Sequence, residues 1–287
     1  MQTKIKTTSY QKAIICMIFA YISIALMGVF VKYASDELPS SEILFSRFLI
    51  GFIFLLPFMI RDGDFKVELS QWPFLVMRNL AGIASMLLTF YAIKYLPISI
   101  AVLLMNTSAL FVPLLLFVLR TRTPLKVLAC SFLGFAGVSI IMLTDSAKHF
   151  ELLHIGYALG AAFLAAMAFI SLQELNKHNS PKNIVFYFHL LGSLLLPLFF
   201  AAQWEVPTAH GLLLLLLVGG FGLIFQLLLT RAFKYAPANV ITPFAFTGVI
   251  FSSICDWLFW HNVPTLNFWI GSLVIILSVS LLAKMRR

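Results

Sequence analysis

Long apolar runs, separated by short polar segments, dominate the pattern of this chain. Each run is continuously apolar instead of alternating every second residue, which favours helices over the strands of a membrane barrel. A helix needs about 20 apolar residues to cross a bilayer. Ten runs of that length can be placed, at residues 11–33, 41–60, 72–94, 97–119, 124–144, 153–173, 182–202, 210–233, 237–260 and 265–284. The pattern predicts an all-α integral membrane protein with ten transmembrane helices.

Prolines mark the edges of these runs. A proline at the start of a helix costs little, because the first N–H groups have no partner within the helix. Six prolines lie at or near predicted helix starts: Pro39, Pro97, Pro124, Pro181, Pro237 and Pro264.

The composition agrees with a lipid environment. The chain has 61% hydrophobic and 11% charged residues, with a mean hydropathy of +0.98. Soluble domains average about 45–50% apolar and about 25% charged residues. We therefore expect the lipid bilayer to be the main partner of the surface, and the sequence leaves no room for a soluble domain.

The net charge of +9 reflects orientation in the membrane rather than binding of nucleic acid. If the N-terminus is cytoplasmic, the inner segments hold 15 of the 20 Lys and Arg residues, and the outer segments hold only 3, Lys32, Lys94 and Lys148. This bias predicts that both termini are cytoplasmic. We expect a bacterial inner (plasma) membrane and an uncleaved first span, and the sequence leaves a homodimer open.

One phrase, Ala-x-Lys-Tyr-x-Pro, occurs twice, at residues 92–97 and 232–237, and so at an offset of 140 residues. The same offset relates several further pairs: Met27 and Met167, Phe48 and Phe188, Pro57 and Pro197, Gly82 and Gly222, and Pro124 and Pro264. The chain therefore divides into a first five-helix repeat, 1–145, and a second, 146–287. An old duplication kept for packing alone is the alternative.

An odd number of helices in each repeat has a geometric consequence. The second repeat enters the membrane from the opposite side, so the two are related by a pseudo-twofold axis in the membrane plane. Inverted repeats of this kind characterise many secondary transporters, whose substrates bind near the midplane between the repeats. We expect alternating access about such a site.

Several motifs resemble one family. They are GVFVK (28–32), SRFLIGFIFLLP (46–57), AIKYLPISIAVLLMNTSALFVPLL (92–115), Gly-x-x-Gly-Val (134–138) and RAFKYAPANVITPFAFTGVIFSSICDWLFW (231–260). Together they resemble the EamA-type transporters of the drug/metabolite transporter (DMT) superfamily. The Gly-Glu that this family often carries after helices 4 and 9 is replaced by LRTRTP (119–124) and FWHNVP (259–264), so no role of that Glu is carried over.

This resemblance implies two inverted five-helix repeats and transport of a small-molecule solute. Members of the superfamily move amino acids, nucleoside-type metabolites such as S-adenosylmethionine, vitamins and toxic cations, in either direction. An exporter of toxic cations or drugs is therefore the alternative within transport. Substrate, direction and coupling ion stay open.

Polar residues inside apolar runs are the candidates for substrate binding, because such groups are costly in lipid unless they have a partner. Arg78 begins a helical stripe that continues through Gly82, Ser85 and Thr89. Asn106 and Gln226 fall near mid-depth, one in each repeat. The predicted substrate-binding residues are Arg78, Tyr91, Asn106, Gln226 and Thr242.

Three other ionisable residues are candidates for a gate or charge network: Arg47, His189 and Asp256. Arg47 and Asp256 both lie toward the outer side in the predicted topology, and we expect them to pair, directly or through water. The alternative is that each side chain extends to its own interface. His189 or Asp256 could carry a coupling proton.

Two other classes of function are less consistent with the sequence. A membrane-embedded enzyme needs converging nucleophile, base or metal ligands, whereas the six histidines are scattered and no paired carboxylates occur. The three cysteines, Cys16, Cys130 and Cys255, show no disulfide or metal-ligand spacing. We expect no catalytic residues, metal or cofactor. A non-transporting membrane scaffold would not need polar groups at mid-depth in both repeats.

Overall fold

The computed structural model of the chain describes residues 7–118, 125–142, 150–236, 244–245 and 247–285. Within these residues every regular element is a helix. The first repeat contains α1 (Thr7–Ala34), α2 (Ser40–Asp62), α3 (Trp72–Tyr95), α4 (Ile98–Asn106), α5 (Ser108–Val118) and α6 (Leu125–Met142). The second repeat contains α8 (Leu152–His178), α9 (Pro181–Phe200), α10 (Ala209–Tyr235), α12 (Thr247–Trp260) and α13 (Leu266–Met285).

The helices follow the predicted apolar runs. In the described part of the chain, six are long and apolar enough to cross a membrane, and shorter apolar helices occupy 98–112, 247–260 and 266–278. Pro39 and Pro97 precede α2 and α4 directly, and Pro181 is the first residue of α9. The multi-pass all-α fold is confirmed, while the predicted starts at Pro124 and Pro237 lie outside the described residues.

The predicted helix at 97–119 is not continuous. It is divided into α4 and α5 at Thr107, whose N–H and Oγ1 both donate to the carbonyl oxygen of Leu104, at 3.1 and 2.6 Å. These bonds tighten the turn and interrupt the α-helical pattern. The interruption follows Asn106 directly. Discontinuous helices at mid-depth are a feature of transporter binding sites, because the freed backbone groups can line a cavity.

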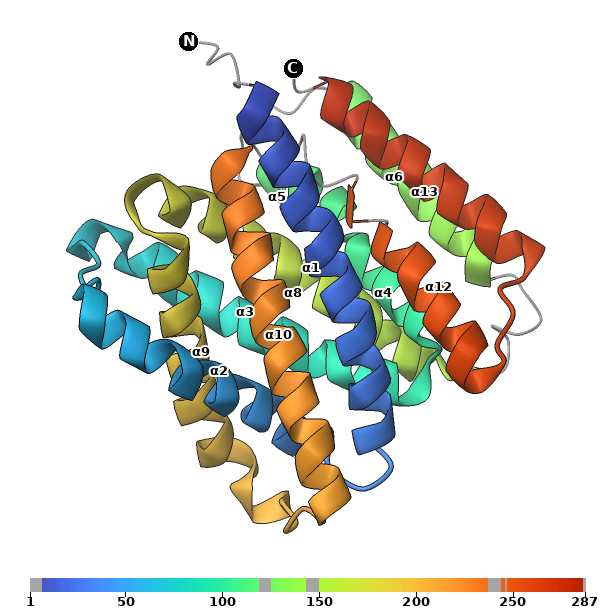
Figure 1. The fold of residues 1–287 in the computed structure, drawn as a ribbon. Coiled ribbons are helices and arrows are strands. Elements are labelled where there is room, and N and C mark those ends of the chain that lie inside the picture. The colour runs from blue at the N-terminus through green and yellow to red at the C-terminus, as the bar shows by residue number, and fades with distance from the viewer. Residues whose placement is uncertain (1–6, 119–124, 143–149, 237–243, 246, 286–287) are drawn as a thin grey trace.

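The packing of the helices shows the relation between the repeats. α1 packs against α10, and its counterpart α8 packs against α3, the counterpart of α10. Equivalent helices also pack in pairs, α2 with α9, α4 with α12, and α6 with α13, while α2 and α12 further contact α10 and α1. A twofold axis between two five-helix units produces this pattern, in which each helix and its counterpart have equivalent partners in the other repeat. The start of α1 and the end of α13 lie at the same end of the bundle (Figure 1), as an even number of crossings requires.

Equivalent residues meet where the repeats face each other. Phe48 of α2 and Phe188 of α9, which are 140 positions apart, pack edge to face with ring centroids 5.0 Å apart. The glycines of the pair Gly82 and Gly222 each make room for an arginine. A Cβ at Gly82 would lie 2.2 Å from Arg78 Nη1, and one at Gly222 would lie 2.5 Å from Arg47 Nε.

Symmetry-equivalent contacts between loops lie at the two ends of the bundle. Glu37, between α1 and α2, accepts hydrogen bonds from Thr208 (2.9 Å) and His210 (2.8 Å) at the start of α10. At the other end, the loop between α2 and α3 contacts the start of α9, where Asn183 donates to the carbonyl oxygen of Asp64 at 2.6 Å. The predicted bounds of the repeats, 1–145 and 146–287, stay a prediction, because their boundary lies outside the described residues.

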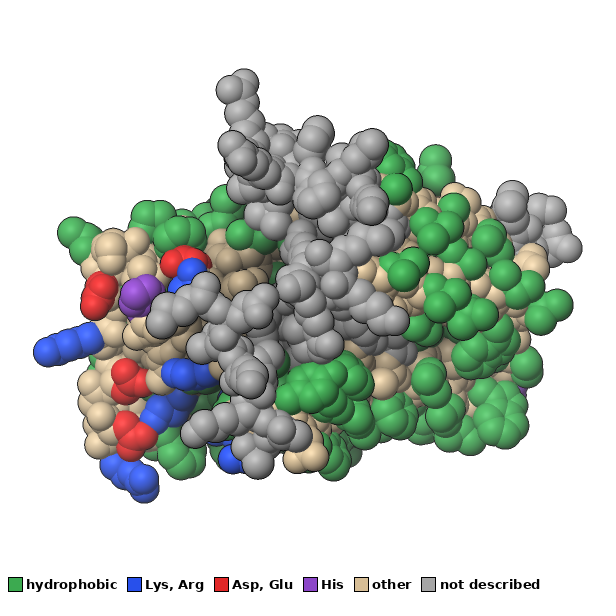
Figure 2. Space-filling model, turned by 90° about the horizontal axis from the view of Figure 1, so that it is seen from above, with side chains coloured by type: hydrophobic (Ala, Val, Ile, Leu, Met, Phe, Trp, Pro, Cys, Tyr) green, Lys and Arg blue, Asp and Glu red, His purple; other side chains and the backbone are tan. Residues whose placement is uncertain are grey.

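The surface separates charge from apolar area. Figure 2 shows the end at which α1 begins, where acidic and basic side chains gather on one side and hydrophobic side chains cover the other. Large apolar side chains are widely exposed on the long helices, including Phe54, Leu198 and Leu216 at 65%, 76% and 52%. Exposure of this kind fits helices that face lipid.

Candidate functional site

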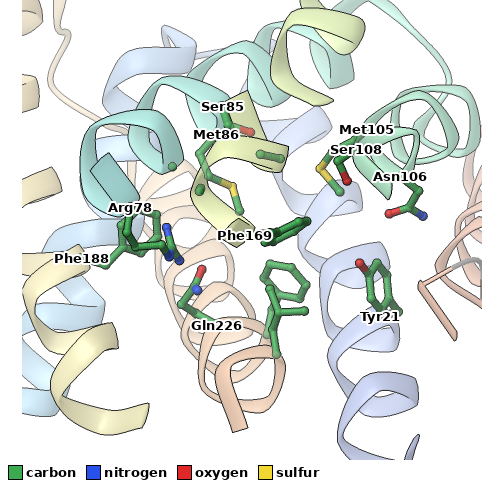
Figure 3. Close-up of a pocket in the computed structure, with 15 residues that line it drawn as sticks. Tyr21, Arg78, Ser85, Met86, Met105, Asn106, Ser108, Phe169, Phe188 and Gln226 are labelled. Atoms are coloured by element: carbon green, nitrogen blue, oxygen red, sulfur yellow. The ribbon is translucent and has the colours of Figure 1, made fainter. Parts of the chain in front are cut away.

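A cavity lies between the two repeats, and with its mouth it holds about 460 Å³ of empty space. Its polar lining consists of Tyr21, Arg78, Ser85, Asn106, Ser108 and Gln226. Its apolar lining consists of Gly82, Met86, Met105, Ala165, Ala168, Phe169, Phe188, Phe225 and Leu229. Both repeats contribute to each set (Figure 3).

Arg78 is the charged residue of this lining. It belongs to α3, is only 3% exposed, and its guanidinium carbon lies 4.2 Å from the centroid of the Phe188 ring. Its Nε has no hydrogen-bond partner in the described part of the chain. Glycine at position 82, one turn further along α3, leaves the space that the guanidinium group occupies. Figure 3 shows the side chain directed toward Gln226.

The two predicted amides reach the cavity from opposite repeats. Asn106 ends α4, and its Nδ2 donates to the carbonyl oxygen of Ala245 at 3.1 Å. Gln226 of α10 is 1% exposed, and its Nε2 has no partner among the described residues. A buried amide without a partner costs about 1–3 kcal/mol. Gln226 is therefore a hydrogen-bond donor that is available to a solute.

The polar stripe predicted on α3 is present in part. Arg78, Gly82 and Ser85 line the cavity, but Thr89 does not, since its Oγ1 donates to the backbone oxygen of Ser85 at 2.8 Å. Tyr91 also lies away from the cavity. It is half-buried against Tyr157, with ring centroids 5.6 Å apart. At about 100° per residue, position 91 falls on the far side of the helix from position 78.

Arg47 and His189 form a buried cluster beside the cavity. Both are 0% exposed. Arg47 Nη2 donates to the backbone oxygen of Gly222 over 3.4 Å, while its Nε and Nη1 have no partner in the described residues. His189 Nδ1 contacts the backbone oxygen of Val185 at 2.9 Å. Neither side chain belongs to the lining of the cavity.

The predicted direct ion pair between Arg47 and Asp256 is wrong for this conformation. Asp256 of α12 instead accepts hydrogen bonds from the first two N–H groups of α4, Ile98 N to Oδ1 at 3.0 Å and Ser99 N to Oδ2 at 2.7 Å. Free N–H groups at a helix start carry partial positive charge, so a carboxylate is stabilised there. Lys32 fixes the same turn by donating to the backbone oxygen of Leu96 at 2.9 Å.

Some of the lining could not be read from the sequence. Phe169, Phe188 and Phe225 are three of 29 phenylalanines, and an apolar face gives no signal that separates a cavity from a core. Met86 carried a usable signal, because it lies 140 positions before Gln226. Thr242 lies outside the described residues, so its predicted role stays a prediction.

Among the described residues, no group of three or more His, Cys, Asp or Glu side chains could hold a metal ion.

A multi-pass bundle of two inverted repeats around a partly polar cavity defines the class of membrane transporters with internal symmetry. The chain belongs to the EamA-like transporter family, whose family model matches residues 11–143 and 152–284. The family places the chain among transporters rather than enzymes, as the sequence predicted. The two matched segments correspond to the two repeats.

Several bacterial relatives match nearly the whole chain. The pseudopaline exporter CntI of Pseudomonas aeruginosa is 28% identical over 96% of this chain and 98% of its own. A riboflavin transporter of Vibrio cholerae is 26% identical over 93% and 91% of the two chains. An S-adenosylmethionine uptake transporter of Rickettsia prowazekii is 25% identical over 96% and 93%. This protein is thus a multi-pass bacterial membrane transporter of a small-molecule solute.

A solved crystal structure supports the fold. It aligns with a TM-score of 0.66 over 98% of this chain and 99% of its own, at 16% sequence identity. At that identity the likeness concerns the fold alone.

Proposed function

We propose that this protein is a secondary transporter that moves a small organic metabolite across the bacterial inner membrane by alternating access, with both termini cytoplasmic. The candidate metabolites are amino acids and nucleoside-type compounds. The supporting observation is that Arg78 and Asn106 of the first repeat and Gln226 of the second line a single cavity. In this proposal all three bind the solute, and rocking of the repeats exposes it to each side in turn.

The surroundings of the cavity support such a motion. The two repeats contact each other through large side chains at the centre, including the Phe48–Phe188 pair, and through symmetry-equivalent loop contacts at the two ends. Contacts that are equivalent by symmetry can exchange roles when the repeats rock, so that one end opens while the other closes. Arg47, His189 and Asp256 lie along this interface, and a role in gating stays a prediction for them.

The test uses purified protein in liposomes with labelled amino acids, riboflavin and S-adenosylmethionine. We expect at least one solute to cross faster than in protein-free liposomes. Ala168→Trp fills the cavity with an indole ring and should abolish this flux whatever the solute is. Phe163→Trp, at a 41% exposed position on the same helix and outside the lining, is the matched control and should transport normally.

Two results would contradict the proposal. Flux through Ala168→Trp at the wild-type rate would show that the solute does not pass through this cavity. Protein that moves none of the labelled solutes above the protein-free rate would argue against transport of this class of metabolite.

A further inference from the structure

Arg78 and Arg47 place two positive charges near the centre of the interface between the repeats. Arg78 stacks on Phe188 with its guanidinium carbon 4.2 Å from the ring centroid, and Arg47 lies 5.3 Å from the ring centroid of Phe48. The two phenylalanines are in contact, so the arginines and rings form a continuous row across the interface.

No described acidic side chain neutralises this row. Eleven Asp and Glu residues occur in the chain, and only Asp145 lies outside the described residues. The ion pairs of the described residues involve Glu37, Asp62, Glu151 and Glu174, none of which pairs with either arginine. Asp256, the acid deepest in the described helices, is engaged by the backbone of α4.

The hydrogen-bond donors of these two arginines are also largely unused. Arg78 makes no hydrogen bond to the described part of the chain, and Arg47 makes only the 3.4 Å contact with Gly222. Guanidinium groups remain protonated in proteins and present a planar fork of donors that matches carboxylate and phosphate oxygens. A buried charge without a counter-charge is strongly unfavourable, so a partner from outside the chain is expected.

We infer that the solute carries an acidic group, a carboxylate or a phosphate, that binds Arg78 in the cavity, while its uncharged part lies against Phe169, Phe188 and Phe225. This rests on the proposed function and adds the substrate class. Arg78 supplies the direct contact because it lines the cavity. Arg47 does not reach the cavity in this conformation and contributes positive potential from behind Phe48. Gln226 Nε2 offers a further donor from the opposite wall.

Thermal unfolding of the purified, detergent-solubilised protein tests this inference with three probes: benzoate, phenyl phosphate and neutral benzamide, at ionic strength matched with chloride. A ligand that binds only the folded state raises the melting temperature. We expect benzoate or phenyl phosphate to raise it by about 2 °C or more beyond benzamide. A response to benzoate alone indicates a carboxylate site, and a response to phenyl phosphate indicates that the site accepts phosphate.

Variants connect the response to Arg78. Arg78→Gln should lose the difference between anion and amide, whereas Arg231→Gln, at an exposed arginine of α10, should keep it. If Arg78→Gln does not fold, Arg78→Met takes its place as the test variant, because it keeps a long unbranched side chain at this position and removes the charge. The inference is overturned if benzamide stabilises the wild type as much as the anions do, if neither anion stabilises it, or if the response survives without Arg78.

Transport measured in parallel separates this inference from the proposed function. An anion response that depends on Arg78, in protein that moves no solute, would contradict the proposed transport but support an anion-binding site. Transport of a neutral or cationic solute at the same rate in wild type and Arg78→Gln would contradict the inferred acidic substrate but support the proposed transport function.

Discussion

Two residues of the cavity lining, Arg78 and Gln226, have buried donors without a hydrogen-bond partner in the described part of the chain. Ser85, Thr89 and Thr230 are buried too, but each donates to a backbone oxygen at 2.8 Å. Arg78 and Gln226 instead leave donors unused. Insertion scales put the cost of an arginine at the centre of a membrane helix at about 2.5–3.5 kcal/mol. Residues that bind a solute are expected to carry this kind of cost when the site is empty.

The first prediction at this scale concerns Gln226. Gln226→Leu removes an unsatisfied buried amide, so we expect the melting temperature to stay unchanged or rise. Loss of one hydrogen bond to the solute, about 1 kcal/mol, should raise the KM for transport about fivefold. Thr230→Val, one turn along α10 and outside the lining, is the control and should leave KM unchanged. A lower melting temperature with normal KM would assign Gln226 a structural role.

A second prediction concerns Arg78. Replacing an uncompensated buried charge by an uncharged side chain should stabilise the empty protein, so Arg78→Gln should melt at or above the wild-type temperature while losing transport. Stability is measured by thermal unfolding without added ligand, and transport in liposomes. Loss of stability together with unimpaired transport would contradict this account of the residue.

The sequence could predict Arg78, Asn106 and Gln226 because a polar residue within an apolar run has few explanations. The helical period could also have placed Tyr91 away from Arg78, since 13 residues at about 100° each put the two positions on different sides of one helix. The sequence could not show that Asp256 binds the start of α4, because a contact over 157 and 158 positions depends on how the repeats pack.

At the scale of elements, Asp256 joins the second repeat to the first by binding the N-terminus of α4. Asp256→Asn keeps the shape of the side chain but turns one acceptor into a donor that faces an N–H group. We expect a loss of about 2 kcal/mol, measured as a lower melting temperature. Ser253→Ala, whose hydroxyl bonds only the backbone of its own helix, should lose less. Equal losses in the two variants would contradict the capping role.

The loop between α1 and α2 yields a prediction about pH. Hydrogen bonds from His210 and Thr208 hold the pKa of Glu37 below its ordinary value. A lowered folded pKa contributes stability that is present above the unfolded pKa, about 4.3, and is lost as pH falls through the folded pKa. The melting temperatures of wild type and Glu37→Gln should therefore differ above about pH 5 and converge in more acidic solution. A difference that persists unchanged in acid would contradict this assignment.

The helices themselves were predictable, because membrane-spanning length and continuous apolarity leave little choice of structure. The break at Thr107 was not. Its sequence, Met105 to Ala109, contains no proline or glycine, and the turn is closed by local bonds to Leu104 that only the folded chain shows. The sequence shows the polar residue Asn106 at this point, but nothing in it indicates the change in backbone path beside it.

At the scale of the whole molecule, symmetry connects the fold to the proposed mechanism. One axis accounts for the exchange of helix partners between α1–α10 and α8–α3, the contact of Phe48 with Phe188, and the symmetry-equivalent loop contacts at the two ends. The repeated phrase in the sequence predicted this relation at an offset of 140 positions. The cytoplasmic face is predicted by the positive-inside bias of the sequence and not by the packing of the helices.

The sharpest test of the inversion is the sidedness of the two repeated segments. Single cysteines would replace Lys94 and Lys234 in a variant whose three native cysteines are changed to serine, and intact cells would be treated with a membrane-impermeant maleimide. We predict that position 94 reacts in intact cells and that position 234 reacts only after the membrane is opened. Reaction of both positions from the same face would contradict the inverted repeats and, with them, alternating access through the central cavity.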